Sequence, residues 1–517
     1  MSSLPAIASA DAQGVEPSTA RPLAIVLAVL ALLYAMRLAI VWQLARDGVG
    51  LHVDEAQYWG WSRELALGYY SKPPLIALLI AASTALFGDG VAGVKALPML
   101  CYPVTALVLY RLGREMADAR TGVLAALLFA STPLAALLGL AATTDAPLLL
   151  AWTLALWCLW HAWQRPNPWA WVLLGAAVGL ALLSKYSAAA FVFTAAGFAW
   201  SERRGGVPLR PRLAGLAVAA AVAVLVLAPN VLWNAAHGWP TWRHTAEITV
   251  GASSRGGLAG LESVSEFALG QLLVIGPLTA VWAMWLSWQP RRPRGAGESS
   301  RAASARRLAL WSAAPPLLLG LLQAAHAHAE INWAAPAAPG AALWVALAAR
   351  RGRASMRWLA ACMAAHIAFA GAAALAAHWP RAAGRALPAW LDAWARMRGW
   401  DSAFDALRPA IAARAPVLIV GTSRAVHAQG GYQLRGLPIE WAAWSPDGRV
   451  HDHYQLTRPL PENARGPLLL LGEDAPSPAL RARFAELRPL QRVRVPVNDR
   501  RAVELQLWEA SGVGAAR

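Results

Sequence analysis

Ionisable side chains gather in the segment "LHVDEAQYWGWSRELALGYYSKPPL", residues 51–75. Asp54 and Glu55 stand side by side there, and Lys72 comes directly before two prolines. A carboxylate can act as a general base. Because proline suits the first turn of a helix, a short helix is expected over residues 74–87, and its free amides together with the lysine cation favour a phosphate. The segment therefore predicts proton transfer beside an anion site.

The same residues also have purely structural interpretations. Asp54 and Gln57 have the spacing of a capping box, which would open a helix that ends near Gly68. The lysine can extend to the lipid headgroups at a membrane surface. Tyr58 and Trp59 suit an aromatic belt at a membrane interface, and they equally suit stacking against a sugar. The residues alone leave both kinds of interpretation open.

Further ionisable residues stand in or beside long apolar runs. Asp145 lies at the start of a run in "ATTDAPLLL", and Lys185 interrupts a run in "LLSKYSAAAF". Arg37 and Lys95 lie inside other runs. Ionisable residues are costly inside a membrane segment, so each is a functional candidate. The structural alternatives are a helix cap by Thr144 or Asp145 and a break between two spans at Lys185.

Histidines near the apolar runs raise the question of a metal. His326, His328 and Glu330 are spaced by two, which does not match the i, i+4 pattern of a zinc site on a helix. We assign no metal ligand, and dependence on a divalent metal stays an open question. The side chains expected to line a pocket beside the charged groups are Tyr58, Trp59, Tyr69, Tyr186, His237, Glu330, Asn332 and Trp333.

The elements that must position these residues are membrane spans. Of the 517 residues, 57% are hydrophobic and 15% are charged, which is too apolar for a soluble multidomain protein. Apolar runs of about 20 residues are typical of transmembrane helices. The candidate runs are residues 23–45, 74–87, 92–112, 121–140, 145–163, 169–183, 186–200, 213–232, 267–288, 308–326, 333–349 and 356–378.

The net charge and the cysteines narrow the possible class of protein further. The net charge of +17 would favour a nucleic-acid partner in a soluble protein. Here the arginines gather in short loops between apolar runs, as the positive-inside rule expects of cytoplasmic loops, so no nucleic acid is expected. The three cysteines all fall inside apolar runs, which predicts neither a disulfide framework nor a thiolate metal site.

Loop charge also sets the expected topology. With every arginine-rich loop in the cytoplasm, eleven runs cross the membrane, and residues 74–87 are too short to do so. Residues 1–21 are expected to form a disordered cytoplasmic tail and 22–378 the membrane domain, in which 46–91 form the first outer loop. Residues 379–517 then finish outside. All three lysines of the chain fall near the outer face, against the positive-inside trend, which favours binding of an anion there.

The C-terminal part of the chain has a different sequence pattern from the apolar runs. The segments "APVLIVG", "PIEWAAW", "PLLLLGE", "LQRVRVPV" and "VELQLWE" predict five short strands, and "SPALRARFAEL" predicts a helix. The expected fold is thus mainly α, a polytopic helical bundle followed by a small extracytoplasmic α/β domain. No motif in that domain indicates a chemical role.

Several segments, in this order, carry a resemblance to a known family. They are "DEAQYWGWSRELALGYYSKPPLIALLI", "ATTDAPLLLAWTLAL", "GLALLSKYSA", "PNVLWNAAHGW" and "EINWAAPAAPG". Over most of residues 20–350 the chain resembles the bacterial polytopic glycosyltransferases of the GT-C superfamily, relatives of the protein O-mannosyltransferases and the lipid A aminoarabinose transferase. The resemblance implies a multi-pass enzyme of the bacterial inner membrane with a cytoplasmic N-terminus.

The resemblance also implies roles for the singled-out residues. The donor would be a polyprenyl-phosphate sugar, the acceptor a lipid, glycan or protein at the periplasmic face, and the reaction would invert the anomeric carbon. Asp54 would be the catalytic carboxylate with Glu55 adjacent, and Asp145 the second important acid. Lys72 would hold the donor phosphate, with Lys185, Lys95 and Arg37 as further cations for the charge on the leaving phosphate. Ser71 departs from the family, which often has an acid or histidine there, and this leaves any metal near Lys72 in question.

Two other classes of protein compete with this interpretation. A transporter or flippase of lipid-linked sugars also carries ionisable residues in its spans, usually near the midplane of the bilayer at a repeat interface. Here these residues gather toward one face, and no inverted repeat is apparent. A non-catalytic scaffold whose outer domain binds cell-wall material is the third possibility.

Overall fold

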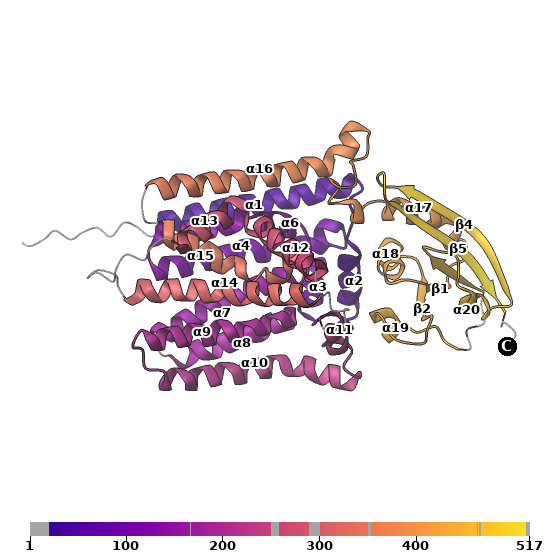
Figure 1. Ribbon diagram of the computed structural model, residues 1–517. Helices are drawn as coiled ribbons and strands as arrows, with labels where there is room; N and C mark the ends of the chain where they lie inside the picture. Colours follow the sequence, from indigo (N-terminus) through magenta and orange to yellow (C-terminus); the bar gives the residue numbers. More distant parts are fainter. Residues whose placement is uncertain are drawn as a thin grey trace, which may run out of the picture.

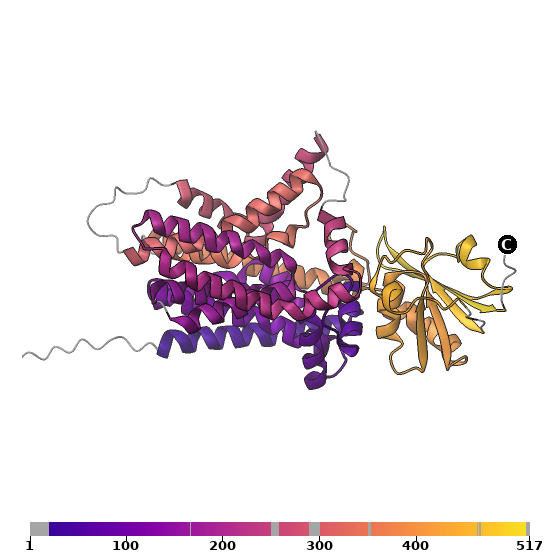
Figure 2. The ribbon, with the colours of Figure 1, turned by 90° about the horizontal axis from the view of Figure 1, so that it is seen from below.

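The computed structural model describes residues 20–165, 167–249, 258–288, 300–349, 353–462, 464 and 467–512. A mainly helical bundle forms one part, and a smaller domain with a sheet packs against one end of it (Figures 1 and 2). The predicted cytoplasmic tail, residues 1–21, lies outside the described residues except for its last two positions.

Six helices of the bundle are long and apolar enough to cross a membrane, and two bent helix pairs raise the number to eight among the described residues. The six are α1 (Ala20–Arg46), α4 (Val91–Met116), α7 (Asp145–Gln164), α10 (Arg210–Ala236), α14 (Ser300–His326) and α16 (Arg353–Ala383). Large apolar side chains stay exposed along α1, α10 and α16. Such continuous apolar surface is suited to lipid rather than water.

Two predicted spans are interrupted rather than straight. Residues 267–288 divide into α12 (Leu258–Ile275) and α13 (Pro277–Trp288), bent by 98°. Gly276 between them has φ +89, a conformation that suits glycine. Residues 121–140 divide into α5 (Ala119–Ser131) and a second short piece, α6 (Pro133–Leu137) with η1 (Leu138–Leu140), bent by 58°. Proline begins the second piece in both cases, because its ring cannot continue the preceding helix.

Shorter helices complete the bundle. They are α3 (Leu75–Phe87), α8 (Pro168–Ser184), η2 (Tyr186–Ala190), α9 (Phe191–Arg204), α11 (Pro240–Thr249), η3 (Ile331–Ala334) and α15 (Ala337–Ala349). The predicted short helix over 74–87 is confirmed as α3, which begins directly after the two prolines. Lys185 lies between α8 and η2, so the predicted break in the apolar run is confirmed there too.

The C-terminal domain is built on a five-stranded sheet of order β2-β1-β3-β5-β4. Its strands are β1 (Val417–Gly421), β2 (Ile439–Ala443), β3 (Leu468–Gly472), β4 (Glu486–Pro496) and β5 (Ala502–Ser511), so the five predicted strands are confirmed. β1 pairs in parallel with β2 and β3, and β5 pairs antiparallel with β3 and β4. The predicted helix over "SPALRARFAEL" is wrong in its second half, because α20 (Pro478–Arg481) stops early and β4 begins within that segment.

Helices of this domain connect it to the bundle. They are α17 (Trp400–Ala412), η4 (Ala395–Met397), α18 (Arg424–Gln433) and α19 (His453–Thr457). α18 packs against α2 (Val53–Arg63), which lies at the end of the bundle that faces the domain (Figure 1). Gln429 donates to the carbonyl of Leu51 at 2.9 Å, and Tyr432 donates to the carbonyl of Asp89 at 3.0 Å. The domain is thus hydrogen-bonded to the segment that holds most of the candidate residues.

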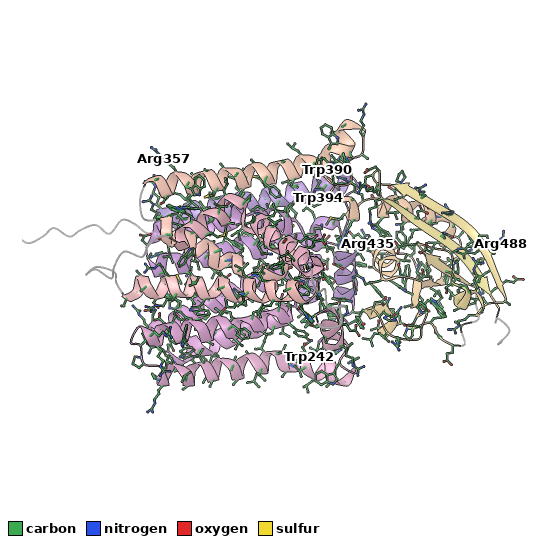
Figure 3. All side chains as sticks on the ribbon, viewed as in Figure 1. Trp242, Arg357, Trp390, Trp394, Arg435 and Arg488 are labelled. Atoms are coloured by element: carbon green, nitrogen blue, oxygen red, sulfur yellow. The ribbon has the colours of Figure 1, made fainter. Side chains whose placement is uncertain are left out.

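The two ends of the bundle differ in the residues that they present. Arg357 lies at the end remote from the C-terminal domain, whereas Trp242, Trp390 and Trp394 lie toward the domain (Figure 3). Tryptophan is enriched at membrane interfaces. The candidate residues on α2 and in the loop before α3 lie at this tryptophan-bearing end.

Candidate active site

Asp54 occupies the first turn of α2 but does not cap it. His52 is the N-cap: its imidazole Nδ1 accepts from the backbone N–H of Asp54 at 3.2 Å, and its own N–H donates to Glu55 Oε2 at 2.8 Å. The predicted capping box of Asp54 and Gln57 is therefore wrong. The helix also ends at Arg63 rather than near Gly68. Because the cap is supplied by its neighbours, the Asp54 carboxylate is available for other contacts, and its side chain is 44% exposed.

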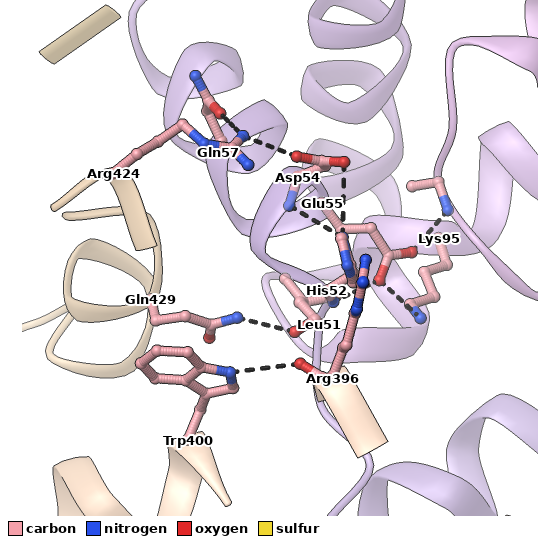
Figure 4. Close-up of polar contacts among 11 residues, drawn as sticks. Leu51, His52, Asp54, Glu55, Gln57, Lys95, Arg396, Trp400, Arg424 and Gln429 are labelled. Carbon is pink, nitrogen blue, oxygen red and sulfur yellow. Dashed lines mark hydrogen bonds and ion pairs between the residues drawn. The ribbon is translucent and has the colours of Figure 1, made fainter. Parts of the chain in front are cut away.

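Arg424 of the C-terminal domain is the main partner of Asp54. Its Nη1 donates to Asp54 Oδ1 and to Gln57 Oε1, each at 2.7 Å (Figure 4). Arg424 starts α18, directly after the turn that follows β1. The loops after parallel strands are where ligand-binding residues gather in α/β sheets. That position is the one signal in the sequence that points to Arg424, and our sequence analysis missed it.

The contact with Arg424 changes the acidity of Asp54. Burial raises the pKa of this carboxyl, but the charge and hydrogen bond of Arg424 outweigh burial, with smaller help from His52 and Lys72. The pKa of Asp54 is therefore lowered from its ordinary value, which keeps the group ionised at neutral pH.

Glu55 faces the interior of the protein and is paired there with a different cation from Asp54. Its Oε1 accepts from the backbone N–H of Ala142 at 2.7 Å, and its Oε2 lies 3.0 Å from Lys95 Nζ. Both side chains of the Glu55–Lys95 pair are almost completely buried, at 2% and 4% exposed. Both oxygens of this buried carboxylate have partners, and the contacts hold α2, α4 and the segment before α7 together. These contacts favour a positioning role for Glu55 and Lys95.

Asp145 forms a second buried pair at the start of α7. Its Oδ1 accepts from Lys185 Nζ at 3.0 Å, and its Oδ2 accepts from Asn332 Nδ2 at 2.7 Å. The preceding Thr144 makes no side-chain cap, so the predicted capping by Thr144 is wrong. Three segments that are far apart in the sequence thus meet at one carboxylate. Asn332, predicted to line the pocket, lies directly in this cluster.

Lys72 differs from the other two lysines. Within the part of the chain that the structure describes, its ammonium group makes no hydrogen bond or ion pair, although the residue is half-buried. Burial lowers its pKa, and so does the charge of Lys185, while Asp54 and Asp145 raise it. Both aspartates therefore lie near enough to act on the same ammonium group. They also act together on the buried Tyr58, whose pKa is raised mainly by burial.

The charged groups thus form one cluster, which we call the Asp54–Asp145 cluster. Asp54, Glu55 and Asp145 are each paired with one cation, namely Arg424, Lys95 and Lys185. Lys72 is the fourth cation and has no carboxylate of its own among the described contacts. The cluster is therefore set up to receive one more anion.

Several predicted pocket residues hold this region in shape. Trp59 Nε1 donates to Asp89 Oδ1 at 2.8 Å, and the buried Tyr69 ring stacks on Trp61 with centroids 4.4 Å apart. Tyr186 donates to Asn230 Oδ1 at 2.5 Å. These contacts join α2, the loop before α3 and η2 to neighbouring segments of the protein.

Other predicted residues are not shown to contact the cluster. His237 is exposed and stacks on Trp233 at the end of α10. Glu330 is exposed and lies 3.4 Å from His328. Trp333 packs against a separate apolar group. Arg37 is buried on α1 and donates to the carbonyl of Ala130 on α5 at 3.0 Å.

The candidate residues that the structure describes do not form a metal-binding group. Over the described ranges, no three His, Cys, Asp or Glu side chains lie close enough together to hold a metal ion. His328 and Glu330 form only a pair at the bundle surface.

Comparisons with known proteins give sequence relatives over part of the chain. Residues 71–233 match the family described as dolichyl-phosphate-mannose-protein mannosyltransferase. The lipid A galacturonosyltransferase RgtD of Rhizobium johnstonii is 33% identical over 302 residues, which is 56% of this chain and 59% of that protein. The undecaprenyl phosphate-alpha-4-amino-4-deoxy-L-arabinose arabinosyl transferase of Pseudomonas aeruginosa is 34% identical over 23% of each chain.

The fold of this chain is similar to that of a solved structure. ArnT from Cupriavidus metallidurans in the apo state matches with a TM-score of 0.61 at 15% identity, over 95% of this chain and 98% of ArnT. The resemblance to the GT-C glycosyltransferases is confirmed. The ArnT-like fold includes the C-terminal domain, since the match covers nearly all of both chains. ArnT has also been solved bound to undecaprenyl phosphate.

Proposed function

We propose that this chain is an inverting membrane glycosyltransferase that moves a sugar from a polyprenyl-phosphate donor to a lipid acceptor. The observation that carries this proposal is the cation Lys72, which lies near Asp54 and Asp145, two carboxylates that already have partners. Relatives that modify lipid A or use undecaprenyl phosphate support the same chemistry. Glycan and protein acceptors, which the sequence analysis left open, have less support.

Lys72 is proposed to bind the phosphate of the donor. It lies two prolines before α3, whose first amides are not capped by a side chain. A phosphate there would receive the ammonium charge and the positive end of the helix together. Lys185 lies close enough to lower the pKa of Lys72, so both cations face the same region. These fixed charges would stabilise the negative charge that grows on the leaving phosphate.

Asp54 is proposed to act on the acceptor. The acceptor oxygen attacks the anomeric carbon and forms a new C–O bond, while the bond from that carbon to the phosphate oxygen breaks. The electron pair leaves with the polyprenyl phosphate, and the proton of an attacking hydroxyl goes to Asp54. Attack opposite the leaving group inverts the anomeric carbon. Asp145 would orient the donor sugar, with Glu55 and Lys95 holding the first turn of α2 in position.

The membrane arrangement is part of the proposal. We propose a multi-pass protein of the bacterial inner membrane, with eleven crossings, a cytoplasmic N-terminus and a periplasmic C-terminal domain. Arg357, at the end remote from the C-terminal domain, supports this orientation, because cytoplasmic loops are rich in arginine and lysine (Figure 3). The Asp54–Asp145 cluster would then lie at the outer surface of the bilayer, where the phosphate of a lipid donor resides.

A transfer assay in vesicles tests this function. The purified protein is reconstituted with a polyprenyl-phosphate sugar labelled in the sugar and with bacterial lipid acceptors. Label that moves covalently to an acceptor lipid supports the proposal. Label that crosses the bilayer while still attached to its donor would instead support the transporter. Absence of both in correctly folded protein would favour the scaffold.

Removal of Arg424 is expected to shift the pH dependence of transfer. Arg424 lowers the pKa of Asp54, whereas burial raises it. In Arg424→Gln the pKa of Asp54 rises, so the base becomes protonated at a higher pH. The acid limb of the kcat/KM profile should therefore move to higher pH. Arg488→Gln, an exposed arginine on β4, is the matched control and should leave the limb in place. An unshifted limb in Arg424→Gln would remove Asp54 from the role of base.

A further inference from the structure

A buried asparagine connects the two segments that carry Lys72 and Lys185. Asn230 on α10 is completely enclosed by the protein. Its Nδ2 donates to the carbonyl of Leu67 at 2.8 Å, and Leu67 lies in the same loop before α3 as Lys72. Its Oδ1 accepts from the hydroxyl of Tyr186 at 2.5 Å, and Tyr186 follows Lys185 directly in the sequence. One side chain therefore bonds to both of the lysine-bearing segments.

A second set of hydrogen bonds holds the same loop one turn farther along α10. Asn234 lies four positions after Asn230, on the same face of the helix, and is also completely buried. Its Oδ1 accepts from the backbone N–H of Thr241 at 3.2 Å, and the hydroxyl of Thr241 donates to the carbonyl of Tyr69 at 2.6 Å. The backbone N–H of Tyr69 in turn donates to the carbonyl of Lys72 at 3.2 Å. These contacts lead from α10 to the backbone of Lys72 itself.

The loop lies directly against α10 between the two carbonyls that are held. At Gly68 an added Cβ would lie 2.4 Å from the ring of Trp233 and 2.9 Å from Asn230 Nδ2. Glycine permits such a close approach because it has no side chain. The loop backbone can therefore come close enough to the helix for the buried amide of Asn230 to reach it.

The two lysines would separate if nothing opposed their repulsion. Burial lowers the pKa of Lys72, and the charge of Lys185 lowers it further, so the two ammonium groups act on each other. Lys185 is held in place by Asp145 at 3.0 Å. The repulsion therefore favours movement of the Lys72 loop, while the hydrogen bonds to α10 oppose it, because buried polar groups are costly to leave unpaired. Cations fixed in this way can stabilise charge on a phosphate without reorganisation of the protein.

We propose that Asn230 is a positioning residue for the donor phosphate, because it fixes the loop of Lys72 relative to Lys185. This inference rests on the function proposed above, in which both lysines face that phosphate. Asn230 is enclosed and bonds to the protein at both ends of its amide, so it acts through Lys72 rather than on the ligand. Tyr186 has the same role from the side of Lys185. Without these bonds, a smaller fraction of the protein would hold Lys72 in place, and the donor affinity would fall by that fraction.

The affinity of the full-length protein for undecaprenyl phosphate, measured by calorimetry in detergent, tests this role. Asn230→Leu keeps a side chain of similar size but removes the hydrogen bonds to both segments. It should weaken binding about 10-fold, as expected for the loss of two buried hydrogen bonds. The unfolding midpoint of the same samples shows whether the variant keeps its fold.

The effect of Asn230→Leu should depend on the presence of Lys72. In a Lys72→Ala background, Asn230→Leu should change the affinity by less than about twofold, because the loop then carries no cation to position. An asparagine that only stabilised the fold would weaken binding by the same factor in both backgrounds, as independent sites do. This pair of measurements therefore separates positioning from a general structural role.

Two further variants complete the test. Tyr186→Phe removes only a hydroxyl and decides the matter if Asn230→Leu does not fold. It should weaken binding about 2- to 10-fold, and again only where Lys72 is present. Gln323→Leu is the matched control, because Gln323 on α14 donates its side-chain amide to the carbonyl of Thr249 at 2.9 Å. That bond connects other segments, so the affinity of the control should stay at the wild-type value.

Two results would overturn the positioning role. One is wild-type affinity in Asn230→Leu and Tyr186→Phe while Lys72→Ala binds weakly, which would leave the proposed function standing. The other is an equal loss from Asn230→Leu with and without Lys72. Wild-type affinity in Lys72→Ala itself would instead remove the proposed function on which this inference rests. Failure of the inference and failure of the function are therefore distinguishable.

Discussion

Asp54→Asn is expected to lower the kcat of sugar transfer about 100- to 10,000-fold, the usual contribution of a positioned general base. Asparagine has nearly the same shape, and α2 should form normally because His52 and Glu55 supply its cap. The change removes the group that accepts the proton of the acceptor hydroxyl. Affinity for the lipid donor should stay close to that of the wild type, since Lys72 is unchanged. Separate measurement of kcat and of donor affinity checks both expectations.

The matched control is an aspartate with no part in the cluster. Asp405 on α17 has a side chain that is 72% exposed and lies 3.6 Å from Arg408. Asp405→Asn should leave kcat within about twofold of the wild type, as expected of an exposed pair. Transfer by Asp54→Asn at the wild-type rate would show that the acceptor needs no base. An acceptor that is already anionic, such as a phosphate, would then be the better interpretation.

Lys95→Met is expected to destabilise the protein by about 3–5 kcal/mol, because it leaves the Glu55 carboxylate buried and unpaired. Glu55 and Lys95 are 3.0 Å apart, and both are almost completely enclosed. The unfolding midpoint of the purified protein should fall clearly in this variant. The double variant Glu55→Gln, Lys95→Met should recover much of the loss, because no buried charge remains.

An exposed ion pair provides the comparison for this effect. Arg492 Nη2 lies 3.1 Å from Glu504 Oε2 on the outer strands of the sheet, and both side chains are partly or largely exposed. Arg492→Met should cost about 0–1 kcal/mol at most. If Lys95→Met were no less stable than Arg492→Met, Glu55 would have to be protonated or solvated, and its proposed positioning role would be wrong.

The sequence predicted the charged members of the site better than their partners. Lys72, Asp145 and Lys185 stood out because ionisable groups are costly beside apolar segments. Arg424 did not stand out, because it is one of 43 arginines and lies in a domain whose sequence carries no recognised motif. Its contact with Asp54 joins residues 370 positions apart. Contacts between residues so far apart in the sequence depend on how the domains pack. The local sequence pattern does not specify that packing.

The sequence also left open what the neighbouring acids Asp54 and Glu55 contact. Asp54 and Glu55 are adjacent, but successive side chains on a helix point in different directions. Asp54 faces Arg424, and Glu55 faces Lys95 in the interior. Sequence alone does not specify which of the two acids is buried. The same limit applies to Tyr69, whose type suited a sugar-binding wall and whose ring is fully buried on Trp61.

Helices and strands could be predicted from the local sequence pattern. The bends within the helices were harder to predict. Short segments rich in apolar residues and separated by turn residues gave all five strands of the C-terminal domain. The bend at Gly276 was missed because the apolar composition continues through it, while φ +89 and the following proline break the helix. Hydropathy reports burial in lipid, and it does not report the backbone geometry within an apolar run.

The affinity of the protein for undecaprenyl phosphate, compared between the wild type and Lys72→Ala, tests the central claim most directly. The claim is that the ammonium of Lys72, to which the described residues give no hydrogen bond or ion pair, holds the phosphate of the lipid donor beside Asp54 and Asp145. Loss of one charged hydrogen bond should weaken binding about 10- to 100-fold. Equal affinity in the two proteins would contradict the account, because the phosphate would then be held elsewhere.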